Sequence, residues 1–420
     1  MLSPTTVSGS QGNPFRIHGT VREPFFTDRH QEVDAFVRIL REPTAKMLVY
    51  GHRRMGKTST LENAVDRVNA DGGHAFLADI STATTLADMA NRILAGATKA
   101  IGQRWTTLAT DLLARLSAGF KLTTDPATGL PTPSLDISVR DASQERQQAS
   151  LAEVLDSLDA LAGARGVTLG LVLDEFQEIS KLGGEEAEWH LRGVMQHHQH
   201  LSYIVAGSKP SVLKAMVDKG RAFYEMLDPY AFGPIDRGHM TAWIDERMRS
   251  VSLVPAGAGE FCVTYAGARS RDIVRLARKC VDRAAPGSTI GAAEVVAAYR
   301  EIIDEDDDTI RSWWNDLKGP RANLVRAIAA ETHGLTTQAA RKQFTLPASS
   351  NVAHALTALI EDGRVIRTRH GSGYTFDNPF VRGWVVVHAL PDLGMRLEPT
   401  YIASPSDEYE THPVRSTSPP

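Results

Sequence analysis

Short apolar runs alternate with amphipathic segments over the first half of the chain. Each run is nearly continuous in hydrophobic residues, which is typical of a strand buried on both faces of a sheet. The predicted strands cover residues 46–50, 74–80, 168–174 and 201–207, and the predicted helices cover 28–40, 58–68, 86–101, 151–161 and 185–198. Strands that alternate with helices predict an α/β fold with helices on both faces of a parallel sheet.

The pattern departs from this alternation in three places. Residues 120–139 contain Asp-Pro, Thr-Gly and Pro-Thr-Pro turn signals, which predict an irregular hairpin inserted into the α/β region. Residues 240–300 show helical periodicity alone. The acidic run at 304–308 predicts a solvated linker or the end of a helix.

A small unit follows Gly319. Its pattern predicts three helices, at 322–331, 336–344 and 349–362. Residues 364–377 then alternate and turn at His-Gly-Ser-Gly, as the two strands of a wing would. Three helices and a hairpin within about 65 residues predict a winged helix-turn-helix domain.

Composition is that of an ordinary globular protein, with 42% hydrophobic and 23% charged residues. The net charge of −4 gives no whole-chain electrostatic argument for nucleic acid. Cys262 and Cys280 lack metal-site spacing, and we expect them to be buried and inert. No apolar run approaches the roughly 20 residues of a membrane span, and no secretory signal begins the chain. We therefore expect a cytoplasmic protein without a membrane partner.

One motif carries a definite chemistry. Residues 51–58 match the phosphate-binding pattern G-x-x-x-x-G-K-[ST] at every fixed position. Its glycines let backbone N–H groups wrap around phosphates, and a helix that begins at the loop adds its positive end. Lys57 would reach the β and γ phosphates of ATP, and the Thr58 hydroxyl would bind Mg²⁺. The predicted nucleotide-binding residues of the loop are Gly51, His52, Arg53, Arg54, Met55, Gly56, Lys57, Thr58 and Ser59.

The alternative interpretation of this motif is a glycine turn that binds no nucleotide. A predicted strand before the loop and a predicted helix after it argue against that alternative. A second signal agrees with this, because the apolar strand 168–174 ends in Asp174 and is followed by Glu175. Asp174 would hold Mg²⁺ through water. Glu175 could polarise an attacking water, which favours hydrolysis over phosphoryl transfer to a small molecule.

Several stretches together carry a family resemblance. They are Phe-Thr-Asp-Arg-His-Gln-Glu at 26–32, Tyr-Gly-His-Arg-Arg-Met-Gly-Lys-Thr-Ser at 50–59, Leu-Asp-Glu-Phe-Gln at 173–177, Ile-Val-Ala-Gly-Ser at 204–208, and the stretch 374–384. They resemble the archaeal-type P-loop ATPases of the STAND/AAA+ superfamily with a C-terminal winged helix. The resemblance covers roughly residues 23–388, and the paired arginines of the loop are its most specific feature.

The resemblance implies further site residues. Phe26 and Arg29 belong to a segment that would lie near the adenine. Ser208, at the tip of the fourth predicted strand, would contact the γ phosphate or the attacking water. The alternative role for Ser208 is a cap on the helix that follows it.

The resemblance also implies two arginine roles. Arg271 stands where relatives place a sensor arginine after Gly-x-Pro, but here Ser270 replaces the proline and Arg269 competes for the role. Arg221 is the candidate for an arginine finger, although relatives carry theirs a few residues further on. For each of these arginines the alternative is a surface ion pair.

The expected domains are a flexible N-terminal arm at 1–22, a P-loop ATPase α/β core at 23–236, a helical lid at 237–310, a winged helix-turn-helix domain at 311–395 and a disordered tail at 396–420. ATP and Mg²⁺ would bind between the core and the lid. Closure of the lid would then reposition the winged helix.

Local charge leaves the partner of the winged helix open. Residues 320–383 contain eight Lys or Arg against four acidic residues, and Arg364, Arg367 and Arg369 fall on the wing, where phosphate contacts are common. The predicted recognition helix 349–362 contains no Lys or Arg, which removes base readout by bidentate arginine. We therefore favour a protein partner over DNA.

The predicted function is a Mg²⁺-dependent ATPase that acts as a conformational switch and has the winged helix as its output. The alternative is an ATP-binding, DNA-binding regulator with slow hydrolysis. A small-molecule kinase is disfavoured by Glu175. AAA+ relatives form rings and STAND relatives form switchable monomers or assemblies, so homo-oligomerisation stays open.

Overall fold

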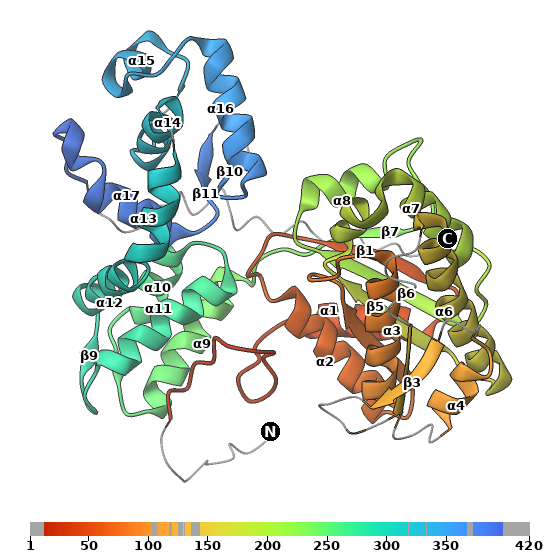
Figure 1. The fold of residues 1–420 in the computed structure, drawn as a ribbon. Helices are drawn as coiled ribbons and strands as arrows, with labels where there is room; N and C mark the ends of the chain where they lie inside the picture. The colour runs from red at the N-terminus through yellow and green to blue at the C-terminus, as the bar shows by residue number, and fades with distance from the viewer. Residues whose placement is uncertain are drawn as a thin grey trace, which may run out of the picture. The chain divides into compact units, whose positions relative to one another are not determined.

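The computed structural model describes residues 12–102, 107–116, 120–124, 129, 131–135, 143–317, 319–332, 334–367 and 373–397. These residues form two compact units (Figure 1). The α/β unit comprises Arg29–Gly233, and the helical unit comprises the described parts of Met1–Asp28 and Pro234–Pro420.

Five strands build the sheet of the α/β unit, and every adjacent pair is parallel (Figure 1). The strands are β1 (Lys46–Tyr50), β2 (His74–Asp79), β5 (Leu169–Asp174), β6 (Leu201–Gly207) and β7 (Asp228–Ala231), in the spatial order β2-β5-β6-β1-β7. Strand β6 separates β1 from β5, because Val205 pairs with Leu48 on one side and Leu173 on the other. All residues of β5 and β6 are buried, which explains their continuous apolar sequences.

Helices cover both faces of this sheet. The helical elements of the unit are α1 (His30–Arg41), α2 (Lys57–Ala70), α3 (Leu86–Ile101), α4 (Leu108–Leu113), α6 (Gln144–Ala164), the 3₁₀ turn η1 (Phe176–Glu178), α7 (Ile179–Met195) and α8 (Pro210–Met216). Helices α1 and α2 pack together against one face, and α3, α6 and α7 form a layer on the other. Helix α7 is broken at Gly184, whose φ of 63° interrupts the helical backbone.

Two features of this unit test the predicted elements. The hairpin expected within 120–139 is present as antiparallel strands β3 (Phe120–Thr124) and β4 (Pro131–Leu135), and residues 136–139 lie outside the described part. The edge strand β7 was not predicted. Its sequence, Asp-Pro-Tyr-Ala, is short, polar and largely exposed, and a proline is tolerated at a sheet edge.

The helical unit continues without a break from the lid region into the winged helix. Its elements are α9 (Arg237–Ser250), β8 (Val254–Pro255), α10 (Ala258–Ala266), α11 (Ser270–Arg283), β9 (Thr289–Ile290), α12 (Ala292–Glu305), α13 (Asp307–Asp316), α14 (Pro320–Ala329), α15 (Gln338–Phe344), α16 (Ser349–Glu361), β10 (Val365–Arg367), β11 (Tyr374–Phe376), α17 (Pro379–His388) and the 3₁₀ turn η2 (Pro391–Leu393). Strands β10 and β11 pair antiparallel and confirm the predicted wing. Its tip, with Arg369, lies outside the described residues.

One hydrophobic core runs through the whole helical unit. The Tyr299 hydroxyl of α12 donates a 2.7 Å hydrogen bond to the Pro379 carbonyl at the start of α17. A side chain at Gly383 would collide with Tyr299 and Ile303, so α17 packs directly on α12. The lid helices and the winged helix are therefore parts of one packed body.

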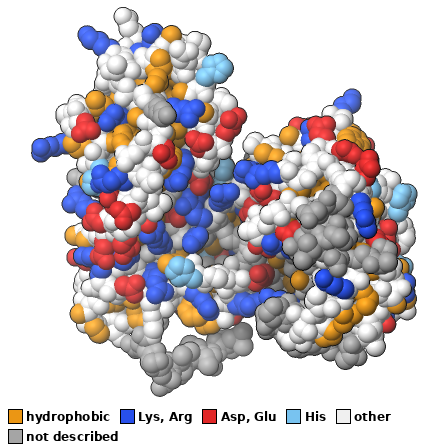
Figure 2. Space-filling model, in the orientation of Figure 1, with side chains coloured by type: hydrophobic (Ala, Val, Ile, Leu, Met, Phe, Trp, Pro, Cys, Tyr) orange, Lys and Arg blue, Asp and Glu red, His pale blue; other side chains and the backbone are white. Residues whose placement is uncertain are grey.

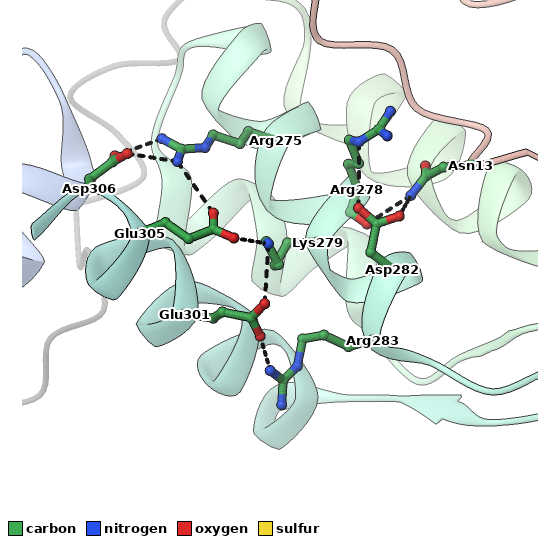
Figure 3. A network of polar contacts seen from close by, with 9 residues as sticks. All are labelled: Asn13, Arg275, Arg278, Lys279, Asp282, Arg283, Glu301, Glu305 and Asp306. Carbon is green, nitrogen blue, oxygen red and sulfur yellow. Dashed lines mark hydrogen bonds and ion pairs between the residues drawn. The ribbon is translucent and has the colours of Figure 1, made fainter.

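Charged side chains add a ladder between α11 and α12 (Figure 3). The Arg275 guanidinium binds both carboxylate oxygens of Asp306 at 2.7 and 2.9 Å. Lys279 and Arg283, at successive turns of α11, pair with Glu301, and Lys279 also pairs with Glu305. The acidic run at 304–308 thus lies where α12 ends and α13 begins, which agrees with the predicted helix end. Asp306 within this run is bound by Arg275 of α11.

Residues 13–15, within the expected N-terminal arm, are packed in the helical unit. Phe15 is fully buried and its ring meets Trp243 edge-on at 5.5 Å. The Asn13 amide donates to the Arg278 carbonyl at 3.0 Å, and the Arg278 guanidinium donates to the Phe15 carbonyl at 2.8 Å. Residues 1–11 and the tail from 398 onward lie outside the described part.

Two further expectations concern buried thiols and membranes. Cys262 and Cys280 are both free and buried, as predicted. The hydrogen bond to the Cys280 thiol raises the pKa of Cys262 most, and burial raises it further, so this thiol resists ionisation.

None of the helices in the described ranges has the length and apolar character needed to span a membrane.

Candidate functional site

The candidate site lies at the carboxyl edge of the five-stranded sheet. Strand β1 ends at the loop 51–58, β5 ends in Asp174, and β6 is followed by Ser208. Because these strands are parallel and adjacent in the order β5-β6-β1, their carboxyl ends meet at one edge. The sheet thus brings together three segments that are far apart in the sequence.

The loop 51–58 has a backbone that few residues could adopt. Arg54 and Gly56 have φ angles of 64° and 91°, and Gly56 immediately precedes the first residue of α2. A Cβ atom at Gly51 would collide with the carbonyl oxygen of Phe232. The two glycines of the motif are therefore required by space and by backbone conformation, and the loop leads into a helix N-terminus as expected for an anion site.

Lys57 is held inside the curve of this loop. Its side chain is only 6% exposed, and its ammonium donates hydrogen bonds of 2.7 Å to the carbonyls of Gly51 and His52. A buried ammonium needs such partners, because loss of hydration is otherwise costly. An anionic oxygen placed at the loop could accept the same N–H groups.

Thr58 and Asp174 form the next part of the site. The Thr58 hydroxyl donates a 2.6 Å hydrogen bond to Oδ2 of Asp174. Burial raises the pKa of Asp174 to about 6, and the negative charge of Glu175 adds to this, whereas the hydrogen bond from Thr58 acts in the opposite direction. A cation near this carboxylate would favour its charged form.

These two oxygen ligands fit Mg²⁺ better than a metal that is enclosed by the protein. Mg²⁺ commonly takes one or two protein oxygens and completes its shell with water and substrate phosphates. In the part of the chain that the structure describes, no group of three or more His, Cys, Asp or Glu side chains could hold a metal. Thr58 and Asp174 are therefore the residues that would hold this ion.

Glu175 is fixed by contacts from two other segments. Its backbone has a φ of 59°, an uncommon conformation for a residue with a side chain. Oxygen Oε2 of its carboxylate accepts a 2.7 Å hydrogen bond from the Ser208 hydroxyl and another from the Gln177 amide. The Arg53 guanidinium also approaches the Ser208 oxygen, at 3.4 Å. The structure therefore places Ser208 beside Glu175, as predicted for the tip of that strand. It also places Gln177 there, a residue that the sequence analysis included only in the stretch 173–177 of the family resemblance.

Arg29 lies beneath the loop. Its guanidinium donates to the Gly233 carbonyl at 2.7 Å and to the Met55 carbonyl at 3.4 Å, and it pairs with Glu32 at 2.6 Å. It also stacks 4.2 Å from the centre of the Phe232 ring. These contacts tie α1 to the loop and to the segment after β7, so Arg29 supports the loop through protein contacts. Phe26 belongs to the helical unit, and its place near an adenine stays a prediction.

The candidate arginines have different surroundings. Arg269 pairs with Asp377 at 2.9 Å, and both side chains are largely buried within the helical unit. Arg271 is exposed, and no ion pair of it occurs among the described residues. Arg221 pairs with the buried carboxylate of Glu188 at 3.0 Å. Structural ion pairs therefore occupy Arg269 and Arg221, and the choice of a sensor between Arg269 and Arg271 stays a prediction.

Several cations of the winged helix are also engaged within the protein. Arg382 is buried and pairs with Glu331, and Arg326 bonds the Ala389 carbonyl. Arg364 and Arg367 of the wing lie over aromatic rings of the same unit. Positive and negative side chains are interspersed on the visible face of both units (Figure 2). The excess of Lys and Arg counted from the sequence therefore overstates the charge available for phosphate contacts.

Solved structures share this architecture across most of the chain. The Walker-type ATPase PABY2304 of Pyrococcus abyssi is 15% identical with a TM-score of 0.60, and the match covers 89% of this chain and 99% of that one. The chain has the fold of a Walker-type ATPase. The ORC2 protein of Aeropyrum pernix, solved in ADPNP–ADP complexes, is 15% identical with a TM-score of 0.51, and the match covers 86% of this chain and 91% of that one. No family profile and no curated protein matches the sequence.

The comparison confirms the predicted fold class. A parallel α/β sheet of the P-loop NTPase type is followed by a helical region, and the similarity to these Walker-type and ORC structures extends over most of the chain. At this level of sequence identity the likeness concerns the fold.

Proposed function

We propose that the chain binds ATP together with Mg²⁺ at the loop 51–58 and hydrolyses it to ADP and phosphate. The observation that carries this proposal is the hydrogen-bonded path from Thr58 to Asp174 and from Glu175 to Ser208 at one edge of the sheet. Phosphoryl transfer requires phosphate binding, charge neutralisation and an oriented nucleophile. The residues of this edge supply all three.

Binding falls to the loop and its lysine. The N–H groups of residues 51–58 and the N-terminus of α2 would bind the phosphates, and Lys57 would exchange its carbonyl partners for β and γ phosphate oxygens. Thr58 and Asp174 would hold Mg²⁺, which when bound neutralises charge on those oxygens. The sequence has no Asn-Lys-x-Asp element for guanine, which favours ATP over GTP.

Hydrolysis would use Glu175 as the general base. The Glu175 carboxylate would accept a proton from a water molecule as the water oxygen bonds to the γ phosphorus. The bond between that phosphorus and the β–γ bridging oxygen breaks, and its electron pair leaves with ADP. Ser208 holds Glu175 at 2.7 Å and lies at the tip of the neighbouring strand, where it could also contact the γ phosphate.

We further propose that the nucleotide state acts as a switch whose output is the winged helix. The shared core of the helical unit supports this, because α12 bonds directly to α17 through Tyr299. The ion pair between Arg269 and Asp377 joins the start of α11 to the wing in the same way. A nucleotide-dependent movement of the lid helices would therefore carry the winged helix with it.

A protein is the favoured partner for this output. The recognition helix α16 contains no Lys or Arg, and several arginines around it are engaged in contacts within the unit. Both features reduce the capacity for base readout and phosphate contacts that DNA binding needs. Whether copies of the chain assemble with one another stays open in this proposal, as does a STAND-like or AAA+-like mode of action.

Steady-state ATP hydrolysis tests the catalytic part of the proposal. The purified chain should hydrolyse ATP only with Mg²⁺, and Glu175→Gln should retain ATP binding while turnover falls at least about 100-fold. Glu186→Gln, which changes an exposed carboxylate on helix α7, is the matched control and should behave as wild type. Duplex DNA should leave the rate unchanged if the partner is a protein. A Glu175→Gln variant that turns over normally would contradict the assignment of the base.

A further inference from the structure

Gln177 is a buried amide next to the proposed base. It lies in the 3₁₀ turn η1 that follows β5, and its side chain is only 3% exposed. A buried amide is stable only where its donors and acceptor find partners. The partners of Gln177 lie in the candidate site, and the proposed hydrolysis assigns this residue no role.

The amide bridges two strand ends. Its nitrogen donates to Oε2 of Glu175, and its oxygen accepts a 3.3 Å hydrogen bond from the backbone N–H of Ser208. Ser208 returns to Glu175 through its own hydroxyl, at 2.7 Å. The three residues thus form a closed ring of hydrogen bonds between the end of β5 and the end of β6.

Both donors of this ring converge on the same oxygen of Glu175. Oε2 accepts from Gln177 and from Ser208, whereas no protein donor bonds Oε1 among the described residues. A carboxylate with one oxygen anchored cannot rotate freely, so its other oxygen keeps a fixed direction. An anchored base with one oxygen left for water is the arrangement that general base catalysis needs.

The surrounding backbone is adapted to the amide. A Cβ atom at Gly207 would collide with the Gln177 side-chain oxygen, so only glycine leaves room for it at the end of β6. Glu175 has a φ of 59°, which is unfavourable and persists only where the surroundings hold it. These features fit an amide that is held in one orientation by the sheet.

We propose that Gln177 is a positioning residue for ATP hydrolysis. By anchoring Oε2 of Glu175 together with Ser208, it directs Oε1 to the attacking water. This inference rests on the proposed function, because Glu175 must be the base. If Gln177 served packing alone, the hydrogen-bonding capacity of its side chain would not matter for turnover.

The substitution Gln177→Glu separates the two roles, because it keeps size and shape. The ionised carboxyl cannot donate to Glu175 and repels it, whereas the protonated form can donate and accept as the amide does. At pH 8 we expect kcat to fall roughly 10–100-fold with the KM for ATP changed less than about twofold. The ratio of variant to wild-type kcat should rise as the pH is lowered toward about 6.

Gln177→Leu is the matched variant, since it cannot regain a donor at any pH. Its kcat should be low throughout, without recovery at low pH. Gly207→Ala reaches the same ring from the other strand and should lower kcat in the same way, which keeps the test informative if one variant folds poorly. Circular dichroism and binding of an ATP analogue verify that each variant is folded.

Two results would overturn the inference. Either Gln177→Glu and Gln177→Leu both retain kcat within about twofold of wild type at pH 8, or Gln177→Glu shows no recovery at low pH and its profile runs parallel to that of wild type. If wild type hydrolyses ATP and Glu175→Gln does not, the proposed function survives either result. If wild type does not hydrolyse ATP, the proposed function and the inference both fall.

Discussion

The hydroxyl of Thr58 donates a 2.6 Å hydrogen bond to Oδ2 of Asp174, although 116 residues separate them in the chain. The parallel arrangement of β1, β6 and β5 brings these residues together, because the carboxyl ends of neighbouring parallel strands share one edge. One oxygen from the loop and one from the strand end can therefore serve the same cation. The two residues are close in space, but no local sequence pattern predicts their contact.

Asp174→Asn should stabilise the metal-free protein. Burial raises the pKa of Asp174 from 3.8 to about 6, so the folded protein binds its proton more tightly than the unfolded chain does. The stability that this proton provides is present below pH 4 and is lost as the pH rises to about 6. At pH 8 in EDTA, the variant should gain roughly 1–3 kcal/mol in unfolding free energy, measured by urea denaturation.

The same titration provides the control for this prediction. Below pH 4 the difference between Asp174→Asn and wild type should vanish, because Asp174 is then protonated in both states. Mg²⁺ with ATP should stabilise wild type and have less effect on the variant. A variant that is less stable than wild type at pH 8 would mean that the carboxylate is compensated in the fold.

Arg269 and Arg271 are a matched pair with opposite expectations. Arg269→Ala removes one partner of Asp377 in a largely buried site and should cost about 3 kcal/mol of unfolding free energy. Arg271→Ala removes an exposed side chain and should change stability by less than about 0.5 kcal/mol. If Arg271 is the sensor, its variant should instead lower ATP turnover. Normal turnover by a folded Arg271→Ala protein would remove this residue from the site.

Arg221→Ala should act on stability through Glu188. The Glu188 side chain is only 1% exposed, and Arg221 supplies one of its partners at 3.0 Å. Loss of that partner should cost about 1–3 kcal/mol, because Arg221 is itself partly solvated. An arginine finger acting between copies would give a specific ATPase activity that rises with protein concentration. We expect the specific ATPase activity of wild type to stay constant as its concentration is raised. A rise that Arg221→Ala abolishes would instead identify Arg221 as an arginine finger.

Duplex DNA should bind only weakly. The arginine-free helix α16 and the engaged arginines of the wing predict an affinity no tighter than the non-specific range of roughly 10⁻⁴–10⁻⁶ M at physiological salt. Fluorescence anisotropy with a random-sequence duplex, at several salt concentrations, measures this. Nanomolar binding that survives physiological salt would favour the DNA-binding regulator over the protein-directed switch.

The inner strands of the central sheet were predictable because strands buried on both faces have continuous apolar sequences. Strands β5 and β6 are buried at every position, and the predicted bounds are nearly those observed. Strand β7 escaped prediction because an edge strand needs little hydrophobic sequence, and only the tertiary register with β1 defines it. The burial of Phe15 was likewise unpredictable, since its partner Trp243 lies more than two hundred residues away.

The candidate site divides in the same way. The residues of the loop, with Asp174 and Glu175, follow local patterns in which spacing and residue type are set by phosphate chemistry. Gln177 belongs to no such pattern, because its hydrogen bond with Ser208 forms only when the ends of β5 and β6 lie side by side in the fold. The environments of the arginines were equally out of reach of the sequence, since Asp377 and Glu188 become their partners only in the fold.

Equilibrium binding of ATP with Mg²⁺ is the most direct test of the central claim. Calorimetric titration should give saturable, one-to-one binding to wild type and none to Lys57→Ala, because that variant loses the ammonium that the loop holds. Lys99→Ala, an exposed lysine at the end of α3, is the control and should bind as wild type does. Binding that survives in Lys57→Ala, or its absence in wild type, would contradict the account.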